Sequence, residues 1–139
     1  MHEQSTRPHT LAVALGDSPA GLAAWIVEKL RAWSDCGGDV EAVFPRQQLL
    51  TWVTAYWVTG AIGTSFAPYA RQSPPSGRID VPTVVSQFPH DLLQAPRSVA
   101  EAQFDLRVFE HGSAGGHFVA WERPEEFVGF VRTALALSS

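Results

Sequence analysis

The sequence IDVPTVVSQFPHDLLQAPRSVAEAQFDLRVFEHGSAGGHF, residues 79–118, decides the fold. Its start, from Ile79 to Val85, is short and rich in β-branched residues, which predicts a buried strand. A loop and a short helix after Pro96 follow, and FDLRVFEH (104–111) predicts a second strand. Strands that alternate with helices favour an α/β fold with a parallel sheet.

Each predicted strand leads into a loop that carries a side chain suited to catalysis. Asp91 lies in the loop after the first strand, and His117 lies in the loop after the second, behind Gly115 and Gly116. In open parallel sheets, sites form at the carboxyl ends of the strands. A carboxylate and an imidazole on adjacent strand ends can meet, as in sites where an acid orients a catalytic base. The alternatives are a local cap ahead of Leu92 for Asp91, and a turn histidine bonded to backbone for His117.

Two helices are predicted on the N-terminal side of this stretch. A hydroxyl cap at Ser18 followed by Pro19 starts the first, and the second covers 46–60. Residues 1–16 show no clear periodicity, and the Pro-, Ser- and Gly-rich stretch 63–78 is typical of a connection. The residues predicted to face the core are Leu22, Ile26, Leu30 and Trp33 in the first helix, and Leu49, Val53, Tyr56 and Trp57 in the second.

A last helix is predicted from Pro124. Its first turn holds Glu125 and Glu126, which suit the positive end of the helix dipole. The second half of the chain is therefore predicted as strand, short helix, strand, histidine loop and helix.

Composition and charge restrict the classes of function. The 139 residues are enough for about one domain, and the net charge of −4, with Lys and Arg scattered, argues against a nucleic-acid partner. No apolar run is long enough to span a membrane, and the polar start has no signal peptide, so a cytoplasmic protein is expected. Cys36 has no basic neighbour that would make it a nucleophile. His111 and His117 have no third ligand nearby, so no metal is expected.

Two segments, GLAAWIVEKLRAW (21–33) and LLTWVTAYWVTGAI (49–62), are too apolar to face water on most sides. A chain of this length supplies few partners for such faces. We therefore expect self-association, or association with a chain that carries the rest of a larger core.

Four stretches of the chain carry a resemblance to a known family. They are QSTRPHTLAVALGDSPAGLAAWIVEKLRAWSD (4–35), YWVTGAIGTSFAPYAR (56–71), VPTVVSQFPHDLLQAPRSVAE (81–101) and GGHFVAWERPEEF (115–127). In this order they resemble the C-terminal part of the α/β-hydrolase epoxide hydrolases, in the branch with the microsomal and juvenile-hormone enzymes. The resemblance implies a C-terminal fragment of an α/β-hydrolase fold: the end of the helical cap over 1–78, and the last two core strands with flanking helices over 79–139.

The family's chemistry, as the resemblance implies it, has two steps. An aspartate attacks an epoxide carbon while two cap tyrosines hydrogen-bond to the epoxide oxygen, and a histidine oriented by a carboxylate then activates water. His117, in the G-G-H-F stretch, matches the base. Asp91, in the FPHDL stretch, matches the orienting acid, where close relatives often have Glu. Tyr69 matches one tyrosine, and Tyr69 and Phe118 are expected to contact the substrate; no cofactor is implied. Tyr56 is the other candidate tyrosine, but its place on a predicted core stripe favours a packing role.

The family's nucleophile, oxyanion loop and second tyrosine have no counterpart in the chain. One interpretation is an epoxide hydrolase to which this chain supplies base, acid and one tyrosine, acting on a small-molecule epoxide. A second is a truncated or complementing fragment without catalysis of its own. Haloalkane dehalogenases and esterases share the fold and the histidine–acid pair, and the tyrosine is what separates them from the first interpretation.

Overall fold

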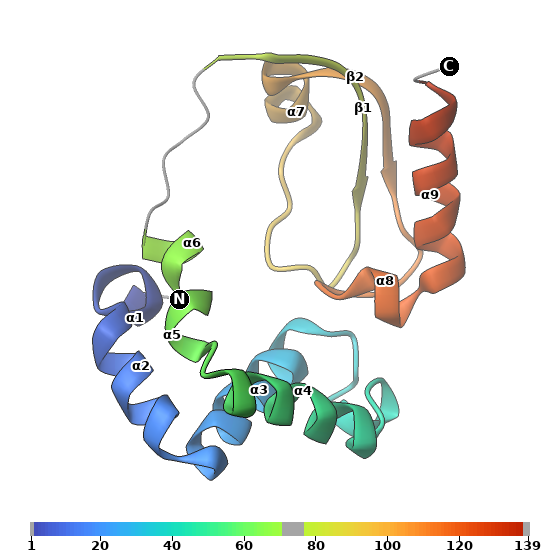
Figure 1. Ribbon diagram of the computed structural model, residues 1–139. Coiled ribbons are helices and arrows are strands. Elements are labelled where there is room, and N and C mark those ends of the chain that lie inside the picture. Colours follow the sequence, from blue (N-terminus) through green and yellow to red (C-terminus); the bar gives the residue numbers. More distant parts are fainter. Residues whose placement is uncertain (1, 71–76, 138–139) are drawn as a thin grey trace. The chain divides into compact units, whose positions relative to one another are not determined.

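A parallel strand pair lies at the centre of the second half of the chain in the computed structural model, which describes residues 2–70 and 77–137 (Figure 1). Strands β1 (Ile79–Gln87) and β2 (Phe104–His111) pair from Ile79 with Phe104 to Gln87 with His111, with two irregularities in register. Helix α7 (Arg97–Gln103) joins them. The predicted parallel sheet is confirmed, and β1 extends two residues beyond the predicted end at Val85, as far as Gln87.

Two helices complete this part of the chain. The short α8 (Val119–Glu122), which the sequence did not predict, leads into α9 (Pro124–Ala136). As predicted, α9 starts at Pro124 with Glu125 and Glu126 in its first turn. It runs beside the strands (Figure 1), and its Phe130 ring meets the buried Phe88 edge to face, with ring centroids 6.0 Å apart.

A glycine directly after β2 allows the aromatic pair to form. A Cβ atom at Gly112 would overlap the ring of Phe88, whereas a Cβ at Gly129, inside α9, would meet nothing within 4 Å. The first position requires glycine for space, and the second does not.

Alanine at these two glycines should therefore change stability in opposite directions. We expect Gly112→Ala to lower the free energy of unfolding by about 1–3 kcal/mol, the typical cost of overpacking a core. Gly129→Ala is the control and should raise it by roughly 0.5–1 kcal/mol, because alanine loses less backbone entropy in a helix. Urea unfolding followed by circular dichroism measures both, and equal stability of the two variants would contradict the packing described here.

The described residues cluster into two units, of which the first comprises 2–31 and 40–70 and the second 32–39 and 77–137. Residues 32–39 thus belong to the same unit as the sheet, whereas the sequence predicts one boundary between the two parts, after residue 78. The helices of the first unit are α1 (His2–Thr6), α2 (Pro8–Asp17), α3 (Pro19–Trp33), the 3-10 turn η1 (Val40–Ala42), α4 (Arg46–Thr59), α5 (Ile62–Ser65) and α6 (Ala67–Ala70), with the last residues of α3 in the second unit.

The first unit has a small apolar core. The Trp25 ring packs edge to face on the buried Phe66, with centroids 6.1 Å apart. The predicted cap of α3 is present, because the Gly21 amide donates to Ser18 Oγ at 3.0 Å. The buried residues of this core are Leu15, Leu22, Val53, Ile62 and Phe66.

Three predictions for the first unit are wrong. No element was predicted for residues 1–16, yet residues 2–6 form α1 and residues 8–16 form most of α2. The apolar residues of α2 run consecutively from Leu11 to Leu15, so they give no helical period. The predicted connection 63–78 contains α6 and most of α5, and its residues 71–76 lie outside the described part of the chain. Tyr56 and Trp57 were predicted to face a core, yet they are 37% and 38% exposed.

The exposed side of α4 carries several large apolar side chains. Leu50 and Val58 are 53% and 71% exposed, beside Tyr56 and Trp57. Self-association through such surfaces stays a prediction. None of the helices in residues 2–70 and 77–137 combines the length and the apolar character that crossing a membrane requires.

Candidate active site

Parallel pairing continues past the strand ends and brings the two predicted site loops together. The Gly112 amide donates to the carbonyl of Gln87 at 2.7 Å, immediately after β1 and β2 end. Further along, the His90 amide donates to the Gly115 carbonyl at 3.0 Å, and His90 and Gly116 form an isolated parallel bridge. The loops that hold Asp91 and His117 are therefore neighbours because their strands are neighbours.

At the end of this pairing, the His117 side chain meets Asp91. Nδ1 of His117 lies 2.8 Å from Oδ1 of Asp91. A carboxylate oxygen accepts hydrogen bonds, so in the neutral imidazole Nδ1 is the donor and Nε2 carries the lone pair. A ring in this tautomer can take a proton from water through Nε2. The side chains are 45% and 33% exposed, so water reaches the pair.

Asp91 also makes the local contact that was its alternative interpretation. Its Oδ1 accepts a hydrogen bond from the Leu92 amide at 2.7 Å. One oxygen thus serves both the backbone and the imidazole. The bond from the Leu92 amide fixes the Asp91 carboxylate relative to its own loop, and this limits where the imidazole can lie.

The two glycines before His117 are required by backbone geometry. Gly115 has a φ of 109°, a backbone conformation that residues other than glycine rarely adopt. A Cβ at Gly116 would lie 2.5 Å from the carbonyl oxygen of Trp33. This close approach lets the His117 amide donate to that same carbonyl at 2.8 Å.

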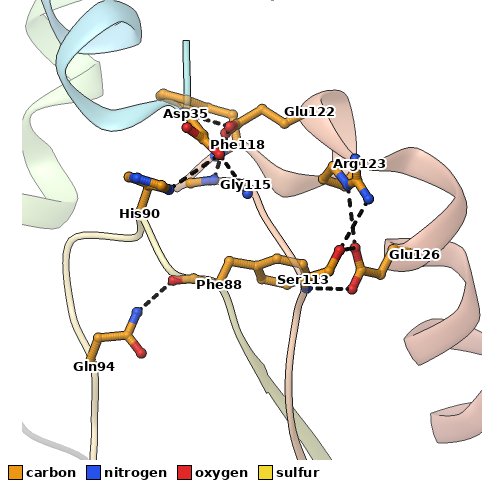
Figure 2. A network of polar contacts seen from close by, with 11 residues as sticks. Asp35, Phe88, His90, Gln94, Ser113, Gly115, Phe118, Glu122, Arg123 and Glu126 are labelled. Carbon is orange, nitrogen blue, oxygen red and sulfur yellow. Dashed lines mark hydrogen bonds and ion pairs between the residues drawn. The ribbon is translucent and has the colours of Figure 1, made fainter. Parts of the chain in front are cut away.

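Two carboxylates hold the histidine loop (Figure 2). Glu122 Oε2 accepts hydrogen bonds from the amides of Asp35, at 2.7 Å, and Gly116, at 2.9 Å, while its Oε1 accepts from Phe118 at 2.9 Å. Asp35 Oδ2 accepts from the Gly115 amide at 3.1 Å and lies 3.2 Å from His90 Nδ1.

Sequence reasoning missed Glu122, Asp35 and His90. A usable signal was present, because a tight glycine loop leaves several amides that need acceptors. The acidic Glu122, five residues after His117, is a short-range candidate for that role. Asp35 is distant in sequence, and nothing in the sequence pairs it with residues 90 and 115.

A second polar cluster ties the start of the loop to α9 (Figure 2). Glu126 accepts hydrogen bonds from the Ser113 amide at 2.9 Å and from the Ser113 hydroxyl at 3.2 Å. The backbone hydrogen bond from Ser113, and then the Ser113 hydroxyl and Arg123, lower the pKa of Glu126. Because the folded pKa is the lower one, this contribution to stability is present above the ordinary glutamate pKa and is lost as the pH falls through the lowered value. The tie is therefore intact at neutral pH.

Aromatic rings surround the imidazole on the protein side. The Trp33 ring stands edge to face against His117, with centroids 5.6 Å apart, and lies nearly parallel to Phe118 at 6.4 Å. Phe118, expected to contact the substrate, is half-buried with its ring 5.3 Å from the imidazole. The imidazole therefore has two aromatic rings beside it.

Tyr69 belongs to the other unit. It lies half-buried on α6, where its amide donates to the Phe66 carbonyl at 3.1 Å. The structure thus joins His117, Asp91 and Phe118 in the second unit and describes Tyr69 within the first. Among the described residues, no group of three or more His, Cys, Asp or Glu side chains is placed to hold a metal ion.

Comparison with known proteins bears on the fold. No family model matches the chain. Epoxide hydrolase 1 of Sus scrofa is 33% identical over 153 aligned positions, which cover 99% of this chain and 34% of the relative. The crystal structure of juvenile hormone epoxide hydrolase from the silkworm Bombyx mori matches with a TM-score of 0.87 and 33% identity, over 97% of this chain and 35% of that one. The structure of Aspergillus niger epoxide hydrolase matches with a TM-score of 0.82 and 33% identity, over 97% and 34%.

The chain therefore spans about a third of the length of the relatives it matches. The predicted resemblance is confirmed, and so is the fold class: the chain is consistent with a C-terminal fragment of an α/β-hydrolase. The match covers the helices of the first unit as well as the two-stranded parallel sheet, whose strands α7 connects and beside which α9 lies.

Proposed function

We propose that this chain, similar over nearly its whole length to part of the α/β-hydrolase epoxide hydrolases, supplies the water-activating pair of an enzyme that opens epoxides to diols. The observation that carries the proposal is the 2.8 Å contact between His117 Nδ1 and Asp91 Oδ1. The two residues stand on adjacent strand ends of a chain whose relatives are named for this reaction.

In the proposed first step, a carboxylate from the rest of the longer enzyme attacks an epoxide carbon. A carbon–oxygen bond of the ring breaks, an ester forms, and the former epoxide oxygen takes up the negative charge. Tyr69 is proposed to donate a hydrogen bond to that oxygen and then its proton. A hydroxyl placed where charge develops stabilises the transition state more than the substrate.

In the proposed second step, His117 Nε2 takes a proton from water. The resulting hydroxide adds to the ester carbonyl to give a tetrahedral intermediate. Its carbon–oxygen bond to the product breaks, the added hydroxyl gives its proton to the leaving alkoxide, and the diol leaves with the nucleophilic carboxylate regenerated. The proton on His117 then returns to the Tyr69 phenolate through solvent, which restores both groups. Asp91 holds the ring in the required tautomer and compensates the positive charge that the ring gains. The ring edges of Trp33 and Phe118 exclude part of the solvent beside the imidazole.

A second proposal concerns the isolated chain, which we infer to be inactive by itself. The sequence offers no match to the family's nucleophile, and the chain spans about a third of its relatives. Without an ester, a base has no intermediate on which its water can act. The chain then acts only as part of a longer protein, or together with a chain that carries the remaining two thirds.

The tyrosine distinguishes an epoxide hydrolase from a haloalkane dehalogenase or an esterase. We join the chain to the N-terminal two thirds of a relative and compare turnover of styrene oxide, a haloalkane and an ester. Tyr69→Phe should slow opening of the epoxide about 10–100-fold, because a hydrogen bond to a charged group contributes roughly 1.5–3 kcal/mol.

Tyr56→Phe is the matched control, since Tyr56 is the chain's other tyrosine and is exposed on α4. It should leave all three rates unchanged. Turnover of styrene oxide by the isolated chain, lost on His117→Ala, would overturn the inference of inactivity. Preferred turnover of the haloalkane or the ester, with no effect of Tyr69→Phe, would favour the corresponding hydrolase instead.

A further inference from the structure

Four consecutive amides around His117 are anchored to the same small set of groups. Gly115 donates to Asp35 Oδ2, Gly116 and Phe118 donate to the Glu122 carboxylate, and His117 donates to the Trp33 carbonyl. With these four amides hydrogen-bonded, residues 115–118 have little freedom of φ and ψ. The direction of the His117 Cα–Cβ bond is therefore fixed by these acceptors.

Glu122 has a special place among them. Its carboxylate bonds the amide on each side of His117 and, through Oε2, also the amide of Asp35. It thereby joins the histidine loop to the segment 33–35, which itself accepts the His117 amide. Removing Glu122 frees two amides of the loop and one of the segment at once.

The segment 33–35 also reaches the loop that holds the orienting acid. The Asp35 carboxylate lies 3.2 Å from His90 Nδ1, and the His90 amide donates to the Gly115 carbonyl. His90 directly precedes Asp91. The loops that carry His117 and Asp91 are thus both bonded to the segment 33–35, and the 2.8 Å contact between the two side chains depends on these bonds.

We propose that Glu122 is a positioning residue for His117, acting through the backbone of residues 116–118 to keep the imidazole on Asp91. Its importance for catalysis rests on the function proposed above, whereas its effect on the pair does not. A carboxylate suits the place because it offers only acceptors to three amide donors, whereas a glutamine would turn an NH2 group toward one of them.

The test uses the full 139-residue chain labelled with 15N-histidine. In the parent chain, the His117 Nδ1 proton is expected at low field and slow to exchange, because Asp91 accepts it. In Glu122→Gln, exchange of this proton should be about tenfold faster or more, with the chain still folded by circular dichroism. Glu125→Gln is the matched control: Glu125 is an exposed glutamate three residues further on, in the first turn of α9, and its replacement should change nothing.

A purely structural role predicts a different result. Glu122→Gln would then lower the unfolding temperature while the Nδ1 proton of the folded chain kept its position and exchange rate, and this outcome overturns the proposal. If Glu122→Gln does not fold, exchange of the Gly116 and Phe118 amides in the uniformly 15N-labelled parent chain decides. Both should exchange at least tenfold more slowly than unbonded amides. Free exchange of either would show that Glu122 does not hold these amides, and would refute the proposal.

In the longer enzyme, Glu122→Gln should slow ester hydrolysis about tenfold while ester formation is nearly unchanged. If the parent enzyme does not react with epoxides at all, the proposed function fails, but the exchange measurement still judges the positioning role. If the parent reacts and the variant hydrolyses its ester at the parent rate, the positioning proposal fails alone.

Discussion

Replacing His117 by glutamine in the longer enzyme is expected to leave attack on the epoxide intact and to slow hydrolysis of the ester by about 10²–10⁴-fold, the usual contribution of a positioned base. The first step uses a carboxylate and a tyrosine, and neither depends on the imidazole. The second step needs a group that deprotonates water, and the pair with Asp91 is the group so arranged in the described site. The ester should therefore accumulate.

Intact-protein mass spectrometry after mixing with styrene oxide reads this directly. The His117→Gln variant should gain the mass of one epoxide, and the parent should not accumulate this adduct. His111→Gln is the control, because that histidine lies at the exposed end of β2 with its ring against Phe109. An adduct in the Tyr69→Phe variant but none in the His117→Gln variant would show that the proposed roles are wrong.

The parallel sheet could be predicted from the sequence, because β-branched strands and helix starts are local signals. The parallel order of β1 and β2 followed from the short helix between them. That order alone predicts that Asp91 and His117 lie on adjacent strand ends. The glycines at 115 and 116 marked the close approach, although not what they approach, which is the backbone of residues 33–35.

The parts that sequence reasoning missed depend on tertiary contacts. Asp35 meets Gly115 across 80 positions of sequence, and Glu122 bonds Asp35 across 87. Periodicity carries no information about such pairs. Tyr56 and Trp57 continue the apolar spacing of α4 but lie exposed, since a repeating pattern identifies a face without identifying what covers it.

The second large effect is expected from Asp91→Asn, which should slow ester hydrolysis about 10²-fold, at the lower end of what losing the base costs. The substitution removes the charge that compensates the imidazolium, and a neutral oxygen does this less well. An amide could also turn its NH2 group toward His117 Nδ1, which would put the proton on Nε2 and stop the ring from acting as a base. The Leu92 amide opposes that rotation, because it donates to the same Oδ1 that faces the imidazole.

These two contacts of Oδ1 decide the size of the effect. With the oxygen held toward Leu92 and His117, Asp91→Asn should retain the Nδ1–H tautomer, visible by 15N-histidine NMR, and lose only the charge. Asp91→Glu is the matched control and should restore hydrolysis to within about tenfold, since a carboxylate again faces the ring. If Asp91→Asn instead shows the Nε2–H tautomer, the Leu92 contact does not hold the side chain, and the loss should approach that of His117→Gln. A parent-like rate of ester hydrolysis in Asp91→Asn would remove Asp91 from the mechanism, because a contact of 2.8 Å to the base cannot then be what orients it.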